Sequence, residues 1–283
     1  MNTTSDINDK IGVGVLIIGD LDEFASLSIE TFRNLNSSRV CYVADELGEL
    51  WLDRHRLMLN NITFCRHQSK EIVFEILSLG NESKYESFGS QKFFTLMILK
   101  WLLILDIWNT HTTLEYVLFS DLDIVWRKSP RIDDIFKKSR QILAIQDDST
   151  SEGRTFYCPG IMIWKKTNQS QFMIKEIYDF QKDEISRGNI IADDKALNAF
   201  ILKNQIEDLV GVLDKKLFVI GHRFPYLLSG VKEFSLRNYY AFHANYVSGG
   251  KLKLIYLRAV LVKPYNPIRY CYVLWYVLRA LRR

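Results

Sequence analysis

The sequence predicts an α/β protein with a mostly parallel sheet that is covered by helices on both faces. Short runs rich in Val, Ile, Leu and Phe alternate along the chain with longer segments of helical periodicity. Several of these runs are continuously apolar, as in strands that are buried on both faces of a sheet. The chain of 283 residues is 48% hydrophobic and 25% charged, so it is long enough to bury a large core.

The elements follow one another in a regular order. Strands are expected at residues 14–18, 39–44, 72–77, 116–120, 142–146 and 161–164. Helices are expected at residues 23–34, 91–107, 171–187 and 194–202. The most apolar stretch, Phe93 to Trp108, contains Lys100 and Asp106 and is too short to cross a bilayer. We therefore expect it to be a helix buried on most sides.

The C-terminal end is strongly basic. The net charge of the whole chain is only +4, yet residues 251–283 contain no acidic residue and eight basic ones: Lys251, Lys253, Arg258, Lys263, Arg269, Arg279, Arg282 and Arg283. A nucleic-acid-binding protein would spread basic residues over its recognition surface, so no nucleic-acid partner is expected. We expect one domain over residues 1–262, followed by a basic amphipathic helix over residues 263–283. This helix either contacts an anionic membrane or packs on the domain itself.

The cysteines and the N-terminus indicate a cytoplasmic protein. Cys41, Cys65, Cys158 and Cys271 are far apart, with no Cys-x-x-Cys pair and no histidine at the usual zinc spacing. Reduced and mostly buried thiols are expected. The N-terminal segment lacks a basic region and a long apolar core, which predicts a first strand and not an export signal.

Two Asp-x-Asp triplets follow predicted strands. The first is Asp20-Leu21-Asp22, and the second contains Asp121 and Asp123 within "VLFSDLDIVW", residues 117–126. Ligands of open α/β sheets bind outside the carboxyl ends of the strands, so position does not distinguish the triplets. Within the first triplet, Asp22 can also cap the following helix.

Later segments distinguish the second triplet. In order they are "CPGIMIWKK" (158–166), "DDKALN" (193–198), "LFVIG" (217–221) and "HANYVSGGKLK" (243–253). Together with "VLFSDLDIVW" this series resembles the nucleotide-diphospho-sugar transferase family, which consists of glycosyltransferases with the Rossmann-like GT-A fold. The resemblance extends from about Phe88 to Lys253. It implies that the nucleoside lies after the first strand, so the first triplet and Asp45 are weaker candidates for nucleoside contacts.

The resemblance implies a metal site and a nucleotide-sugar site. Asp123 is expected to coordinate Mn²⁺ (or Mg²⁺), Asp121 to contact the ribose or the metal's coordination shell, and His243 to complete the metal site. Lys253, or less favourably Lys251, would pair with the diphosphate of the donor.

Further residues are assigned to the donor and the reaction. Gly249 would let the backbone approach a phosphate, and Lys100 is also assigned to the cofactor-binding set. Asp193 would contact the sugar at the anomeric centre, the alternative being a helix N-cap. Asp194 is assigned a catalytic position with it, although it stands where the family has glutamine. Together with Cys158, which stands where asparagine is common, it leaves the identity of the donor sugar open.

The expected function is a metal-dependent glycosyltransferase. It would move a sugar from a nucleotide-sugar donor, most favourably a UDP-sugar, to a glycan, glycolipid or glycoprotein acceptor, with retention implied by the resemblance. One alternative is a phosphatase of the haloacid dehalogenase type with Asp121 as nucleophile. A second alternative is a non-enzymatic adaptor at a membrane surface. We expect a cytoplasmic protein with peripheral membrane contact.

Overall fold

The computed structural model describes residues 10–35, 39–78, 91–149, 155–189, 191–223, 238–245 and 249–261. The helix expected over residues 263–283, and the domain boundary before it, lie outside the described residues. Among the helices in these ranges, none combines the length and apolar character needed to cross a membrane.

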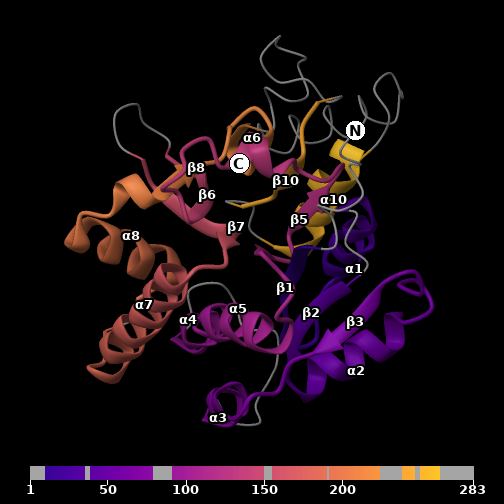
Figure 1. Cartoon of the computed structure of the whole chain (residues 1–283). Coiled ribbons are helices and arrows are strands. Elements are labelled where there is room, and N and C mark those ends of the chain that lie inside the picture. The colour runs from indigo at the N-terminus through magenta and orange to yellow at the C-terminus, as the bar shows by residue number, and fades with distance from the viewer. Residues whose placement is uncertain are drawn as a thin grey trace, which may run out of the picture.

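A central sheet of seven strands forms the framework, in the order β3-β2-β1-β4-β7-β6-β8 (Figure 1). β1 pairs in parallel with β2 and β4, β2 with β3, and β6 with β8, whereas β7 is antiparallel to β4 and β6. The predicted mostly parallel sheet is confirmed. In chain order the strands are β1 (Ile11–Ile17), β2 (Arg39–Ala44), β3 (Thr63–Arg66), β4 (Tyr116–Ser120), β6 (Leu143–Asp147), β7 (Tyr157–Lys165) and β8 (Val210–Val212).

A smaller sheet of three strands, in the order β5-β10-β9, was not predicted. It consists of β5 (Ile124–Trp126), β9 (Phe218–Ile220) and β10 (Ala241–His243), and three residues are too few for a periodic pattern. β10 is antiparallel to β5, with His243 opposite Ile124. The register therefore places His243 beside the Asp-x-Asp triplet that precedes β5.

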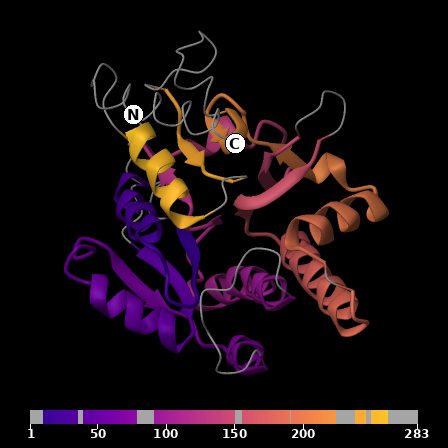
Figure 2. The same cartoon turned by 180° about the vertical axis from the view of Figure 1, so that it is seen from behind.

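Helices cover both faces of the central sheet. They are α1 (Glu23–Glu30), α2 (Glu46–His55), α3 (Lys70–Ser78), α4 (Gln91–Met97), α5 (Leu99–Thr110), α6 (Ile132–Ile135), α7 (Asn168–Ser186), α8 (Asp193–Asn204) and α10 (Gly250–Leu261). Short 3-10 segments are η2 (Thr31–Leu35), η3 (Glu207–Leu209) and η4 (Gly221–Arg223). In both views α10 lies beside α1, on the side of the sheet away from α5 and α7 (Figures 1 and 2).

One strand prediction was wrong. The apolar segment 72–77 belongs to α3, and the strand at this point in the chain is the preceding β3. Ile72 is buried, whereas Phe74 and Leu77 are 64% and 69% exposed. A short apolar run does not distinguish a strand from a helix that buries only one side.

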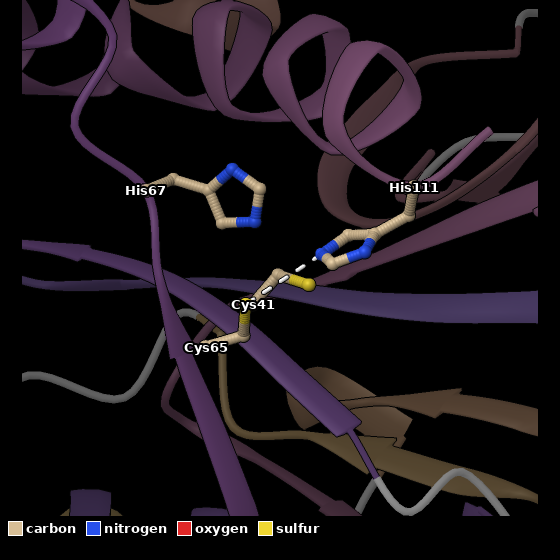
Figure 3. Close-up of side chains that lie close together, drawn as sticks. All are labelled: Cys41, Cys65, His67 and His111. Atoms are coloured by element: carbon tan, nitrogen blue, oxygen red, sulfur yellow. Dashed lines mark hydrogen bonds between the residues drawn. The ribbon is translucent and has the colours of Figure 1, made fainter.

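The described cysteines carry free thiols in the structure. Cys41 is buried, and Cys65 and Cys158 are half-buried, while Cys271 lies outside the described residues. Cys41 and Cys65 lie on neighbouring strands, close to His67 and His111 (Figure 3).

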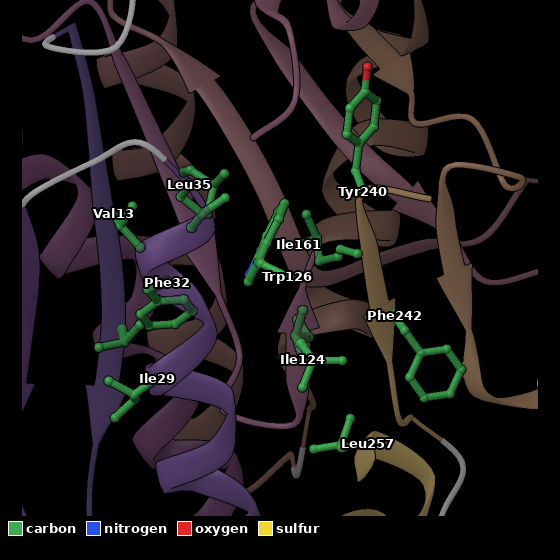
Figure 4. Packing of buried hydrophobic residues seen from close by; sticks show 14 of the residues in the cluster. Val13, Ile29, Phe32, Leu35, Ile124, Trp126, Ile161, Tyr240, Phe242 and Leu257 are labelled. Carbon is green, nitrogen blue, oxygen red and sulfur yellow. The ribbon is translucent and has the colours of Figure 1, made fainter. Parts of the chain in front are cut away.

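Two apolar clusters fill the spaces between the sheet and the helices. Figure 4 shows the one that joins α1, η2, β1, the small sheet and α10. Ile29 and Phe32 contribute to it from the N-terminal part of the chain, and Leu257 from α10. Burial of each such side chain contributes about 1.5–3 kcal/mol to the hydrophobic free energy of folding. The ends of the described chain are thereby packed into one core.

The second cluster contains α5, which is buried on most sides as predicted. Leu99, Trp101, Leu103, Ile104 and Ile107 have no measurable exposure. Glycine in β1 lets this helix approach the sheet, because a Cβ atom at residue 14 would lie 3.1 Å from Ile107 Cδ1 and 3.5 Å from Leu103 Cδ2. α5 therefore packs directly on the sheet, and this packing positions Lys100 near the N-terminal end of the helix.

Candidate active site

The carboxyl end of β4 presents Asp121 and Asp123 where three strands meet. The backbone N–H of Asp121 donates to the carbonyl of Gly160 on β7, at 2.8 Å. The carbonyl of Asp123 accepts from the N–H of Ala244, which follows β10, at 2.9 Å. Both carboxylates are thus attached to a backbone fixed on two sides.

Asp123 carries a buried carboxylate with a cationic group at each oxygen. Its Oδ1 lies 3.1 Å from Nε2 of His243, and its Oδ2 lies 2.6 Å from Nζ of Lys253. Burial alone would raise the pKa of this carboxyl, but the charges of Lys253 and His243 hold it well below its usual range. The carboxylate is therefore ionised at neutral pH.

His243 is held from both sides of its ring. Nδ1 lies 2.8 Å from Oε1 of Gln146, opposite the contact between Nε2 and Asp123. Burial disfavours the imidazolium, yet the neighbouring charge of Asp123 raises the pKa of His243 well above its ordinary value. Gln146 and Asp123 together fix the orientation of the ring.

The glycine of the "CPG" segment provides the space for this histidine. A Cβ atom at Gly160 would lie 2.3 Å from Cε1 of His243, much closer than real contacts permit. The absence of a side chain is therefore a steric requirement of the site. Cys158, two residues earlier, has a pKa raised by burial, which keeps its thiol protonated.

Lys100 links Asp121 to the "DDKALN" segment. Its ammonium lies 2.9 Å from Oδ1 of Asp121 and 2.6 Å from Oδ2 of Asp193, and the side chain is 2% exposed. Burial alone would lower the pKa of Lys100, but the two carboxylates raise it above the ordinary lysine value. For Asp121 burial outweighs the attraction of Lys100, and the pKa of its carboxyl is raised.

Asp193 and Asp194 form the first turn of α8. The N-cap position belongs to Ala192, so the interpretation of Asp193 as the N-cap was wrong. The carboxylate of Asp193 instead contacts Lys100. Asp194 accepts from the backbone N–H of Lys195 at 2.7 Å, and burial, followed by the charge of Asp193, raises the pKa of its carboxyl.

α10 brings Lys253 to the site. Gly249, immediately before this helix, has φ +87°, a conformation that favours glycine, and its carbonyl accepts the N–H groups of Leu252 and Lys253 at 3.1 Å. The Lys251 side chain is exposed, whereas Lys253 contacts Asp123. Of the two lysines, the structure thus brings Lys253 to the carboxylates.

Residues 61–257 match the family model for nucleotide-diphospho-sugar transferases. The chain belongs to this family. It is accordingly a glycosyltransferase, and the family match covers every residue assembled above.

Solved structures agree on the GT-A-like fold of this transferase. A glycosyltransferase involved in glycosylation of the major capsid of PBCV-1 matches with a TM-score of 0.52 at 9% identity, over 88% of this chain and 98% of that one. Mouse xyloside xylosyltransferase 1 in its apo form matches with a TM-score of 0.52 at 12% identity, over 83% of this chain and 98% of that one. The search of curated proteins gave no match.

The first Asp-x-Asp triplet of the transferase has other partners. Asp20 forms an exposed ion pair with Arg54, and Asp22 is at the N-cap position of α1 without a side-chain cap hydrogen bond. Asp45 caps α2 by accepting from the N–H of Gly48 at 2.7 Å. Nucleoside contacts by these residues stay a prediction.

Two residues of the transferase site could not be assigned a role from the sequence. Gln146 is the last residue of a predicted strand and has no local motif, and only the fold shows its contact with His243. Gly160 lies in a quoted segment, but its steric role depends on a ring 83 positions later in the chain. The roles of Gln146 and Gly160 follow from contacts between segments that are distant in the sequence, and a spacing pattern does not reveal such contacts.

Proposed function

We propose that this transferase uses a nucleoside-diphosphate sugar, most favourably a UDP-sugar, and requires a divalent cation held by Asp121, Asp123 and His243. The observation that carries the proposal is the convergence of these side chains. One ligand atom from each lies within 4.8 Å of the others. The acceptor would be a glycan, glycolipid or glycoprotein.

The donor set fits a hard divalent cation. Two carboxylates and one imidazole match Mn²⁺ better than Mg²⁺, since Mg²⁺ prefers oxygen ligands alone. When bound, such an ion would offset negative charge on the diphosphate leaving group. The low pKa of Asp123 supports the fit, because a carboxyl group binds a metal ion in its ionised form.

Lys253 is proposed to bind the diphosphate. Its side chain is 22% exposed and already lies beside Asp123, so a small change of side-chain torsions would direct the ammonium outward. The residue is in the first turn of α10, where the helix dipole also favours an anion. Gly249 would allow close approach of the backbone to a phosphate.

Asp193 is proposed to contact the donor sugar, with Asp194 next to it. Lys100 would act mainly by positioning, because its buried ammonium holds Asp193 and Asp121 in one arrangement. This arrangement supports a sugar site beside the metal site. We also propose retention of the anomeric configuration, as the family resemblance implies, which NMR of the first-formed product would test.

A screen of UDP- and GDP-sugars tests the proposal. Hydrolysis of one donor should depend on Mn²⁺ and stop when the ion is chelated. Asp123→Ala should abolish this activity, whereas Asp183→Ala, at an exposed position on α7, should not change it. Asp20→Ala should leave the apparent Mn²⁺ affinity unchanged, although it alters the same sequence triplet. Full activity of Asp123→Ala, or full activity with the cation removed, would reject the metal assignment.

Membership of the transferase family decides against the phosphatase alternative. The corresponding measurement is release of phosphate from a generic phosphomonoester, which we expect to be absent. Phosphate release that depends on Asp121, without hydrolysis of any nucleotide sugar, would contradict the transferase proposal.

We propose that the transferase acts at the cytoplasmic surface of an anionic membrane. The acid-free basic segment 251–283 supports this location, and Lys251 and Arg258 on α10 are exposed. Flotation of the full chain with anionic liposomes should fall when residues 263–283 are deleted. Equal flotation of the two proteins would refute the role of the tail.

A further inference from the structure

A second group of metal-ligating side chains lies away from the candidate active site. Cys41, Cys65, His67 and His111 each direct one ligand atom into a common space, and these atoms all lie within 4.8 Å of one another (Figure 3). We refer to these four residues as the Cys/His cluster. The transfer chemistry proposed above does not use them.

The fold assembles the cluster from three elements. Cys41 on β2 and Cys65 on β3 are direct partners in a parallel strand pair. His67 follows β3 and is fixed by its N–H, which donates to the carbonyl of Tyr42 at 2.8 Å. His111 is the C-cap residue of α5, and its N–H donates to the carbonyl of Ile107 at 2.8 Å. The backbone positions of all four residues are therefore set by regular structure.

His67 is oriented as metal-binding histidines are. Its Nδ1 lies 2.7 Å from Oδ2 of Asp106 on α5, which directs Nε2 toward the cysteines. The residue is 3% exposed, and Nε2 has no hydrogen-bond partner among the described residues. A buried imidazole nitrogen without a partner is costly, whereas a bound metal ion would satisfy it.

The spacing of the ligand atoms suits a tetrahedral zinc ion. Zinc–sulfur and zinc–nitrogen bonds of about 2.3 and 2.0 Å place the ligand atoms of a tetrahedron about 3.5 Å apart. The Sγ atom of Cys65 lies 3.6 Å from Nε2 of His111. Two sulfurs and two imidazoles also form one of the common ligand sets of structural zinc sites.

We propose that Cys41, Cys65, His67 and His111 bind one Zn²⁺ ion as a structural site. Both thiols lose their protons to solvent on binding, so the two thiolates balance the charge of the ion and two protons are released. The exposed Arg39 side chain, whose Nη1 lies 3.0 Å from Nδ1 of His111, would turn away so that Nδ1 carries the imidazole proton. With four protein ligands the site is closed, and it has a structural role instead of a catalytic one.

The ion would join the edge of the central sheet to α5. β3 is the edge strand, and β2 is its neighbour. Lys100 lies 11 positions before His111, which corresponds to about 16 Å along a helix. The cluster is therefore separate from the candidate active site, and its soft sulfur ligands select zinc over the hard cation expected there.

Metal analysis of the full-length protein, purified without chelators, tests the site. We expect about one zinc ion per chain in the wild-type protein and in Asp123→Ala, and almost none in Cys65→Ser or His111→Gln. His55→Gln is the matched control, because this histidine stacks on Trp51 outside the cluster. Asp106→Asn should weaken zinc binding by about 10–100-fold while it keeps all four ligands.

Two measurements on the wild-type protein do not depend on whether variants fold. Replacement of zinc by Co²⁺ should give the sulfur-to-cobalt charge-transfer absorption of a tetrahedral thiolate site. A thiol-modifying reagent should release the zinc in proportion to the thiols that react. Wild-type protein without zinc that also fails to bind Co²⁺, or zinc retained in both ligand variants, would overturn the proposal. A Cys41–Cys65 disulfide, found by mass spectrometry after alkylation, would also overturn it.

Discussion

The Nζ atom of Lys100 lies 2.6 Å from Oδ2 of Asp193, which joins the N-terminal part of α5 to the first turn of α8. The same ammonium also contacts Asp121. Lys100→Met would leave the buried Asp193 carboxylate without its cation. We expect the free energy of unfolding to fall by about 3–5 kcal/mol, measured by urea denaturation.

An exposed ion pair provides the control for this variant. Lys10 and Glu115 have side chains that are 44% and 52% exposed, and their pairing contributes little in water. Lys10→Met should change the free energy of unfolding by less than about 1 kcal/mol. Equal effects of the two substitutions would contradict a special role for Lys100.

Gly160→Ala tests the steric requirement at His243. The new methyl group would meet the imidazole ring, so the ring must move away from Asp123. We expect a loss of stability of about 1–3 kcal/mol together with weaker Mn²⁺ binding, measured by calorimetry.

Gly188→Ala separates the two effects. Gly188 has φ +81°, and a Cβ atom added there would meet no other side chain or backbone atom within 4 Å, so alanine strains the backbone without touching the site. It should lower stability and leave Mn²⁺ affinity unchanged. The steric account of Gly160 fails if Gly160→Ala binds Mn²⁺ as tightly as Gly188→Ala does.

Asp147 is expected to contribute to the acid sensitivity of the fold. Burial opposes ionisation, but hydrogen bonds from Lys215 and from the N–H of Ser149 lower the pKa of its carboxyl. The folded-state pKa is thus below the unfolded value of about 3.9. The stabilising contribution of the Asp147 carboxylate is complete above the unfolded-state pKa and is lost as the pH falls through the folded-state pKa.

Asp147→Asn should therefore lower the free energy of unfolding at pH 7 by about 1–3 kcal/mol. The difference from the wild-type protein should shrink below about pH 4. Urea denaturation at a series of pH values measures both effects. A difference that stays constant from pH 7 to pH 3 would exclude the ionic contribution.

Substitution of Asp194 should change the stability at neutral pH in the opposite direction to substitution of Asp147. Its carboxyl has a raised pKa, so the folded state favours the neutral form and ionisation at neutral pH destabilises the fold. Asp194→Asn should therefore increase the melting temperature at pH 7. Transfer activity should fall at the same time if the carboxylate contacts the donor sugar. A variant that is more stable and fully active would remove Asp194 from the catalytic set.

The sequence predicted the parts of the fold that have long, regular patterns. The buried helix around Trp101 and the strand before Asp121 were identified because their apolar residues continue over many positions. The small sheet was missed because its strands have three residues each. The same limit affected the segment at Ile72, where one buried residue per turn does not define an element.

For the site, the ordered motifs predicted Asp121, Asp123 and His243 as metal ligands, and the structure brings these three side chains together. Their binding of a metal stays a proposal. The contact between Lys100 and Asp193 could not be predicted, because nothing in either segment specifies the other. The Cys/His cluster was missed for the same reason. Its residues have no zinc-motif spacing, and only the pairing of β2 with β3 makes them neighbours.

The packing of α10 on α1 has a consequence for the order in which the enzyme becomes functional. Translation produces α1 early, but Lys253 is added only after more than two hundred further residues. A domain generally folds as a unit during synthesis. The core that α1 and α10 share can therefore close only after the segment with Leu257 has been added. A growing chain that has reached only residue 249 would lack both this part of the core and the cation beside Asp123, so the same segment completes the fold and the candidate site.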